Sequence, residues 1–133
     1  MKNLRSNGGF SLVELMIVIV IIGVLAAVAV PIYNNNVRKA KMSEADAALG
    51  SIRTQLRVYY GENGSYPVAA SAVYVFEASW ADVRSGELTG TYFTDSSYTY
   101  TGDGTEYDIS CAAGGILDSP RVLDENGAFS GGI

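Results

Sequence analysis

Histidine is absent from the 133 residues, and Cys111 is the only cysteine. A chain without histidine has no His-based catalytic triad and no histidine metal ligand, and one cysteine can form no intramolecular disulfide. Cys111 falls in a stretch that we predict to be a strand, where a cysteine is typically a small buried hydrophobe and not a nucleophile. The composition therefore predicts a protein that is not an enzyme and has no cofactor.

Basic residues are scarce in the second half of the chain. Residues 61–133 contain two bases against eleven acids, whereas residues 10–60 contain five bases against three acids. A strongly acidic surface repels nucleic acid phosphates and keeps a domain soluble. We therefore expect no nucleic acid partner. The basic residues Arg38, Lys39 and Lys41 are expected to face acidic surface on neighbouring copies.

The acidic residues near the C-terminus are candidate calcium ligands, since carboxylates supply the oxygen atoms that Ca²⁺ prefers. They are Asp103, Asp108, Asp118, Asp124 and Glu125. Their spacing matches no dedicated calcium loop, and Asp or Asn beside Gly is an ordinary turn former. We accordingly predict turns here and no metal site.

A continuous apolar run fills residues 10–30, in which Ser11 and Glu14 are the only polar residues. As a helix with a rise of about 1.5 Å per residue, 21 residues cover the ~30 Å hydrocarbon thickness of a bilayer. A carboxylate at the centre of such a helix costs roughly 2.5 to 3.5 kcal/mol, and less near an end. Glu14 therefore needs a partner.

Three interpretations of this run compete. An ordinary membrane anchor explains the length but neither Glu14 nor the Gly8-Gly9 doublet. A secretory signal would place an A-x-A-like cleavage site at Ala27-Val28-Ala29, but Glu14 interrupts the front of its apolar stretch. In the third interpretation the basic leader MKNLRSNGG is removed after Gly9. Phe10 then gains a charged amine one helical turn from Glu14, on its own chain or a neighbouring one.

The stretch GGFSLVELMIVIVIIGVLAAVAVP resembles the N-terminus of type IV prepilins and of the related type II secretion pseudopilins. The resemblance covers 24 contiguous residues: a basic leader ending in Gly9, then Phe10, Glu14, an apolar run with Gly23, and Pro31. Ser11 stands where Thr is common in the family, a mild departure.

The resemblance implies that a prepilin peptidase cuts between Gly9 and Phe10 and methylates the new amine of Phe10. It also implies that Glu14 neutralises this amine on an adjacent subunit during assembly. The implied partners are other copies of the chain in a helical filament, the membrane before assembly and an inner-membrane assembly platform. The implied location is the inner membrane for the precursor, with the head outside. The mature subunit would then belong to an extracellular pilus (fimbrium) on a bacterial cell surface, or to a periplasmic pseudopilus.

Helical periodicity continues beyond the apolar run. Apolar or small residues recur three or four positions apart and predict one buried helix face (Val37, Ala40, Ala45, Ala48, Leu49, Ile52, Leu56 and Tyr59). We predict a helix from Phe10 to Tyr60, with a kink at Pro31 and its weakest part at residues 23–31. Gly23 and Ala27 form a small-xxx-small pair that could let helices approach closely.

The remaining residues predict a small antiparallel sheet. Residues 98–111 resemble a hairpin around Gly102-Asp103-Gly104, and residues 121–130 a second one around Asn126-Gly127. Residues 76–85 are expected to form a short helix with Trp80 and Val83 turned inward. The predicted fold class is α+β: a long kinked N-terminal helix whose C-terminal half packs on a small head of three or four strands, the pilin-like lollipop.

The resulting domain organisation has four parts: leader (residues 1–9), transmembrane or filament-core helix (10–31), amphipathic helix (32–60) and β-rich head (61–133). Many type IV pilins close a C-terminal loop with two cysteines, whereas this chain has one. The head must then be held by packing and strand pairing, or by hairpin hydrogen bonds at its very end. The single cysteine also fits a pseudopilin or a shorter pilin. A different class of function also stays open, a secreted binding module released by signal peptidase after Ala29.

Overall fold

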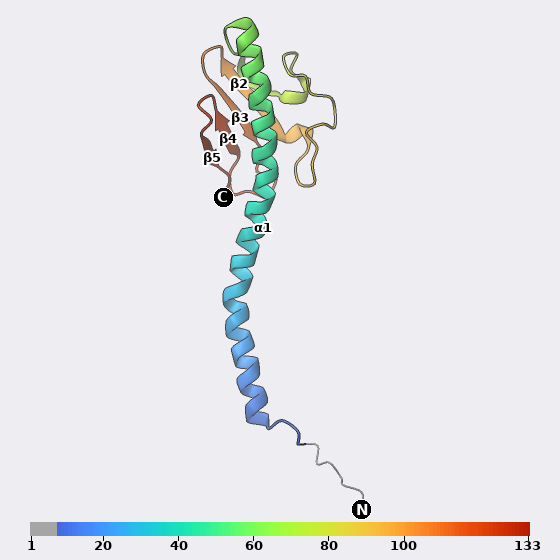
Figure 1. The fold of residues 1–133 in the computed structure, drawn as a ribbon, viewed down its shortest axis with the longest axis vertical. Coiled ribbons are helices and arrows are strands. Elements are labelled where there is room, and N and C mark those ends of the chain that lie inside the picture. Colours follow the sequence, from blue (N-terminus) through green and yellow to red (C-terminus); the bar gives the residue numbers. More distant parts are fainter. Residues whose placement is uncertain (1–7) are drawn as a thin grey trace, which may run out of the picture. The chain divides into compact units, whose positions relative to one another are not determined.

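The computed structural model describes residues 8–133, which form one long helix followed by a five-stranded antiparallel sheet (Figure 1). Helix α1 comprises Leu12–Asn63. The described chain divides into two compact units, the first ending at Asn36 and the second comprising Val37–Ile133. The predicted α+β fold class, with a long N-terminal helix and an antiparallel sheet, is confirmed. The described residues include the last two positions of the expected leader, and the rest of the leader lies outside them.

The first unit contains the part of α1 that is apolar on all sides. Its large side chains are all exposed, from Leu12 at 74% to Ile32 at 55%. Among residues 8–133, α1 is the one helix long and apolar enough to cross a membrane, with a mean hydropathy of 3.1 in its most apolar window. A helix with no polar face suits lipid or the interior of a helix bundle.

The second unit contains the amphipathic part of α1. Ala45, Leu49, Ile52 and Leu56 are fully buried, as the helical periodicity predicts. Ala40 is exposed, contrary to the prediction, because its turn of α1 precedes the first fully buried residue of the core.

Helix α1 begins two residues later and ends three residues later than predicted. Gly61 does not stop it, since a single helical Gly costs only about 1 kcal/mol. The end is set by Gly64, which has a φ of +75° and donates its N–H to the Tyr60 carbonyl at 2.8 Å. A Gly with positive φ just beyond the last turn is a common helix terminator.

The sheet has the order β1-β2-β3-β4-β5, and every neighbouring pair is antiparallel. The strands are β1 (Val68–Tyr74), β2 (Tyr98–Asp103), β3 (Tyr107–Cys111), β4 (Arg121–Asp124) and β5 (Phe129–Gly131). The sheet thus has one strand more than the three or four expected. The pairing of β1 with β2 is irregular between Ala69 and Val73.

Both predicted hairpins are confirmed. Tyr98 pairs with Cys111 and Tyr100 with Ile109 across the β2–β3 hairpin. In the β4–β5 hairpin Leu123 pairs with Phe129, and Gly127 in the turn has a φ of +85°. The inward residues of β2, β3 and β4 pack on the buried face of α1 and form one core with Val75, Phe93 and Leu117. Cys111 is fully buried in this core, as predicted.

The predicted helix over residues 76–85 is wrong. Only Val75–Glu77 form a 3₁₀ turn (η1), and the backbone N–H groups of Ala78 and Ala81 bond to carbonyls three residues earlier in isolated turns. A helix of ten residues is marginal without tertiary support. Trp80 and Val83 are nevertheless half-buried against the core.

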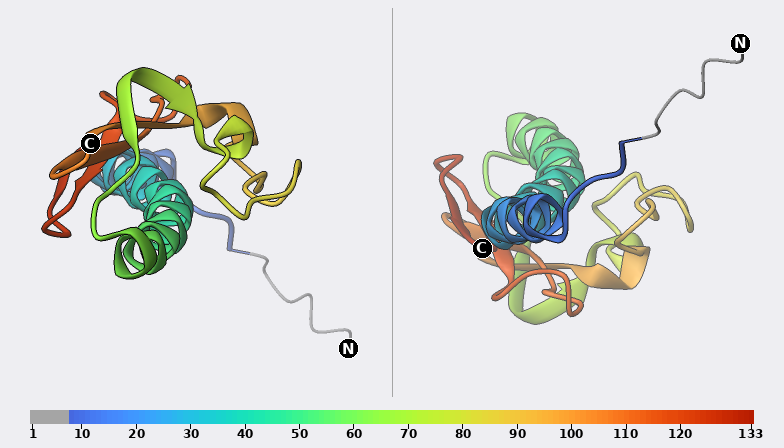
Figure 2. Two further views of the ribbon diagram at one scale, coloured as in Figure 1. Left: turned by 90° about the horizontal axis from the view of Figure 1, so that it is seen from above. Right: turned by 90° about the horizontal axis from the view of Figure 1, so that it is seen from below.

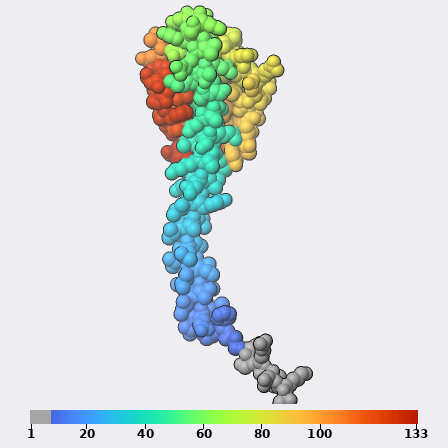
Figure 3. Space-filling view, in the orientation of Figure 1, coloured from blue at the N-terminus to red at the C-terminus, as the bar shows by residue number. Residues whose placement is uncertain are grey.

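The segment between β1 and β2 lies on the other side of α1 from β4 and β5 (Figures 2 and 3). It ends in a second 3₁₀ turn, η2 (Asp95–Ser97). Asp95 is its buried carboxylate and accepts the backbone N–H groups of Gly86 and Leu88 and the hydroxyl of Thr89. One buried side chain thus organises a loop that has no regular secondary structure of its own.

Candidate functional site

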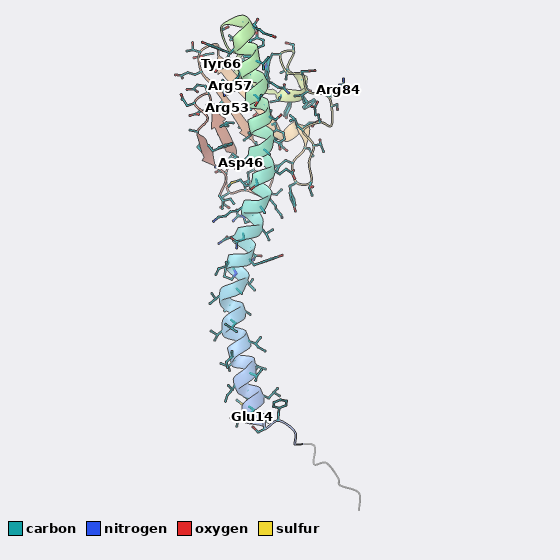
Figure 4. The ribbon with its side chains drawn as sticks, viewed as in Figure 1. Glu14, Asp46, Arg53, Arg57, Tyr66 and Arg84 are labelled. Carbon is teal, nitrogen blue, oxygen red and sulfur yellow. The ribbon has the colours of Figure 1, made fainter. Side chains whose placement is uncertain are left out.

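Glu14 lies in the first turn of α1 and forms a reciprocal pair of hydrogen bonds with Ser11 (Figure 4 labels Glu14). The Ser11 N–H donates to Glu14 Oε2 at 2.8 Å, and the Glu14 N–H donates to Ser11 Oγ at 3.2 Å. The Ser11 carbonyl accepts the first helical bond, from the Leu15 N–H. These contacts define a capping box, with Ser11 as the N-cap.

The capping box gives Glu14 a partner within its own chain. Its carboxylate also lies at the end of the helix where the aligned peptide dipoles favour negative charge. Oε2 is occupied by Ser11, whereas Oε1 makes no hydrogen bond within the described residues. A carboxylate oxygen next to the predicted cleavage junction therefore remains available as an acceptor. Sequence reasoning missed this cap, although the spacing S-x-x-E before an apolar run is its usual signature.

Gly9 and Phe10, the predicted cleavage junction, lie before the helix in exposed backbone. Phe10 is 89% exposed, and no atom lies within 4 Å of where a Cβ on Gly9 would be. A protease needs access to both sides of the bond that it cuts, and the described part of the chain leaves this bond open. The first seven residues of the predicted leader lie outside the described residues.

Gly23 and Pro31, the predicted flexible positions, both lie inside α1. The ring of Pro31 has no N–H, so the Ala27 carbonyl four residues earlier loses its helical donor. A Cβ at Gly23 would have no neighbour within 4 Å, so close helix approach at this residue would require a second chain. The kink at Pro31 stays a prediction.

Three of the five candidate calcium ligands, Asp103, Asp118 and Asp124, are engaged in turns and ion pairs. Asp103 accepts the N–H groups of Thr105 and Glu106 at 2.8 and 2.9 Å, and these bonds lower the pKa of its carboxyl. Asp124 accepts the Ala128 N–H at 2.7 Å, and Asp118 pairs with Arg38. Within residues 8–133, no three His, Cys, Asp or Glu side chains are placed to hold a metal ion.

Two of the three bases expected to face neighbouring copies contact their own head. Arg38 pairs with Asp118 and also donates to the Ile116 carbonyl at 3.3 Å. The Lys41 ammonium lies 5.0 Å from the centre of the Tyr92 ring. Among these three, Lys39 is the one whose side chain makes no hydrogen bond, ion pair or ring contact in the described chain.

Comparison with known proteins places the N-terminal motif and the whole chain in one family. The model of the prokaryotic N-terminal methylation motif matches residues 4–30. The chain is 34% identical to the type IV major fimbrial protein FimA of Dichelobacter nodosus over 109 residues, which cover 73% of this chain and 69% of FimA. It is 31% identical to a fimbrial protein of the same organism in a match covering 97% of this chain and 87% of that protein.

A higher identity over a shorter stretch is found with the fimbrial protein EcpC of Eikenella corrodens, at 45% over 64 residues. That match spans 42% of EcpC, and the matches with several further fimbrial relatives also span less than half of the relative. All these relatives are named as fimbrial proteins and not as enzymes.

An N-terminal methylation motif, a helix whose first part is apolar and exposed, and a five-stranded antiparallel sheet fit a membrane-anchored α+β precursor. The chain belongs to the type IV prepilin family, since relatives more than 30% identical match it over two thirds or more of their length.

Proposed function

We propose that the protein is a structural subunit of a type IV pilus filament. The observation that carries this proposal is a single carboxylate, Glu14, on an otherwise apolar helix whose large side chains are all exposed, within a methylation motif. Such a surface needs either lipid or other helices around it. The names of the relatives, which include a major fimbrial protein, favour a pilus over a secretion pseudopilus.

The precursor waits in the inner membrane with its head outside, and the apolar first part of α1 spans the hydrocarbon. Prepilin peptidase cuts between Gly9 and Phe10 and methylates the new amine. Subunits then leave the lipid for the filament through an assembly platform, and the mature filament lies outside the cell. Because apolar helix surface passes from lipid to other helices with little net gain, packing and charge pairing must supply the order.

Because of the capping box, Glu14 can act both in the membrane precursor and in the assembled filament. Cleavage leaves the Ser11 N–H in place, so Oε2 continues to cap α1 while Oε1 accepts the Phe10 amine of an adjacent subunit. The pair fixes the axial register of neighbouring helices. An unpaired Glu14 in the bundle would be a buried charge without compensation, which typically costs about 3 to 5 kcal/mol.

Substituting Glu14 tests this function, with two variants that separate the charge from the cap. Glu14→Val removes both, whereas Glu14→Gln keeps the cap acceptor and loses the charge. Both variants should be processed and inserted into the membrane. Neither should yield more than a small fraction of the wild-type filament in sheared fractions. Normal filament yield from Glu14→Gln would overturn the role of the charge.

A further inference from the structure

A groove of about 340 Å³ lies in the head between the last turns of α1 and the segment that follows η1. It is lined from both sides by aromatic rings, carboxylates and one amide: Gln55, Tyr59 and Glu62 on α1, and Trp80 and Asp82 across from them. Figure 2 shows this segment beside α1, on the side away from β4 and β5. The groove is separate from the N-terminal assembly motif.

The lining has the chemistry of a cation site. Tyr59 and Trp80 are half-buried and present ring surface, and Trp80 is held in place against Tyr100 with ring centres 4.8 Å apart. Glu62 and Asp82 approach from opposite walls, and their side chains make no hydrogen bond or ion pair in the described chain. No Lys or Arg lines the groove. Aromatic rings and carboxylates around one space are how proteins hold an ammonium group.

A hydrogen-bond acceptor on the same wall also lacks a partner. The side-chain oxygen of Gln55 is buried, yet receives no donor within residues 8–133. Buried polar atoms are nearly always hydrogen-bonded, so each exception needs an explanation. An N–H donor in the groove would supply a partner once the Gln55 amide turned its oxygen toward it.

We propose that this groove binds the Lys39 ammonium of a second copy of the chain. The inference rests on the proposed function, because it requires parallel copies in a filament. Lys39 is exposed and unpaired in its own described chain, whereas the Lys41 ammonium already lies over Tyr92. The acidic groove and the unpaired lysine are complementary in charge.

Position along α1 separates Lys39 from the other exposed bases. Lys39 lies 20 residues before Tyr59 and 23 before Glu62, which at the helical rise is about 30 to 35 Å. Parallel copies displaced by that distance bring Lys39 level with the groove of the next copy. Arg57 lies only five residues before Glu62 on α1 and would require neighbours displaced by about 8 Å. Arg84 lies outside α1, two residues after Asp82 (both arginines are labelled in Figure 4).

Zero-length carbodiimide cross-linking of intact wild-type filaments tests the contact, since it joins an amine to a carboxylate only where the two touch. Filaments assembled from mixed ¹⁴N and ¹⁵N subunits identify bonds between copies by their mixed-isotope peptides. We expect mixed-isotope cross-links from Lys39 to Glu62 or Asp82. The Lys39→Arg variant should lose them, because guanidinium does not react.

Charge reversal provides the second arm. Lys39→Glu and Glu62→Lys should each lower filament yield about tenfold, an effect typical of contacting charges, and the double variant should restore it. Glu77→Lys, at an exposed carboxylate outside the groove, is the control and should leave the yield unchanged. Circular dichroism reports that each variant head is folded, because Trp80 lines the groove and its emission would respond to the charge change itself.

The outcomes separate this inference from the proposed function. Two results would overturn the Lys39 contact and leave the pilus proposal standing. One is that Lys39 cross-links to other residues in wild-type filaments. The other is that the double variant does not recover the filament yield. A wild-type chain that is expressed with its assembly machinery and forms no filament would overturn both.

Discussion

Arg121 of β4 and Asp46 of α1 form a two-pronged ion pair that ties the C-terminal hairpin to the helix. Arg121 Nε lies 2.7 Å from Asp46 Oδ1, and a terminal guanidinium nitrogen lies 3.2 Å from Oδ2. The same guanidinium donates to the Gly131 carbonyl on β5 at 2.9 Å and lies 4.7 Å from the centre of the Phe129 ring. Arg121 thus joins β4, β5 and α1 through a single side chain.

Breaking this pair should destabilise the head. The two side chains are 15% and 29% exposed, so water screens the pair only in part. We expect Asp46→Asn to lower the free energy of unfolding by about 1.5 to 3 kcal/mol, the range for hydrogen bonds to charged groups. Urea titration of the full-length protein in detergent, followed by Trp80 emission, measures the loss.

The matched control is Asp118→Asn, which removes the more exposed pair with Arg38, where the side chains are 33% and 64% exposed. Exposed pairs contribute about 0 to 1 kcal/mol. Equal losses from the two variants would contradict the special role of Asp46.

The Glu44 carboxylate holds the loop before β2, because it accepts the N–H groups of Thr91, Tyr92 and Phe93 at 2.9 to 3.0 Å. The bond from Tyr92 has the largest effect, and the three bonds together lower the pKa of the Glu44 carboxyl below its ordinary value of 4.5. A lowered folded pKa gives stability that is present above pH 4.5 and is lost as the pH falls through the folded pKa. The urea concentration at the midpoint of unfolding should therefore fall as the pH is lowered below 4.5. It should fall less steeply in the Glu44→Gln variant.

Gly90 provides an independent check on the same contact. A Cβ at this residue would overlap the Glu44 carboxylate. Gly90→Ala should therefore displace Glu44 and reproduce the flatter pH dependence of Glu44→Gln. A Gly90→Ala protein with wild-type stability across this pH range would show that the loop does not depend on Glu44.

Cys111 should not react in the folded protein. Its side chain is fully buried, and burial raises the pKa of its thiol to about 11, so the reactive thiolate is scarce at pH 8. A maleimide should leave the native protein unmodified and add once per chain in urea, as intact mass will report. Rapid labelling without denaturant would mean that the core around β3 is open.

Because Ser11 caps α1 and carries no charge, substituting Ser11 should impair the protein less than substituting Glu14. Loss of an N-cap hydroxyl costs about 0.5 to 2 kcal/mol, so Ser11→Ala should fray the start of α1 without removing the Glu14 charge. Amide exchange of residues 12–15 in detergent should rise in Ser11→Ala and stay near wild type in Ser11→Thr. Filament yield should fall far less in Ser11→Ala than in Glu14→Gln. The reverse order would assign the assembly role to the cap.

Local patterns in the sequence predicted the elements whose cause is local. The three- and four-residue spacing identified the buried face of α1 at Ala45, Leu49, Ile52 and Leu56. Turn residues identified both hairpins, since Gly127 requires a positive φ that few residues adopt.

The parts that sequence reasoning missed depend on distant residues. Strand β1, VAASAVY, has no alternating apolar face, and most of its side chains are exposed. The sequence of β1 therefore contains no local pattern that would predict its pairing with β2. The loop that follows is shaped by Asp95 and by Glu44, which lies 47 to 49 residues from the N–H groups it accepts. The Ser11 cap, by contrast, has a local signature, S-x-x-E before an apolar run, so this part of the site can be read from the sequence.

In the proposed filament every subunit begins at Phe10 with a modified amine beside Glu14. Intact-mass and N-terminal fragment spectra of protein from purified filaments measure this directly. We expect a chain that starts at a methylated Phe10. A filament protein that retains the first nine residues, or a secreted protein that starts at Val30, would contradict it.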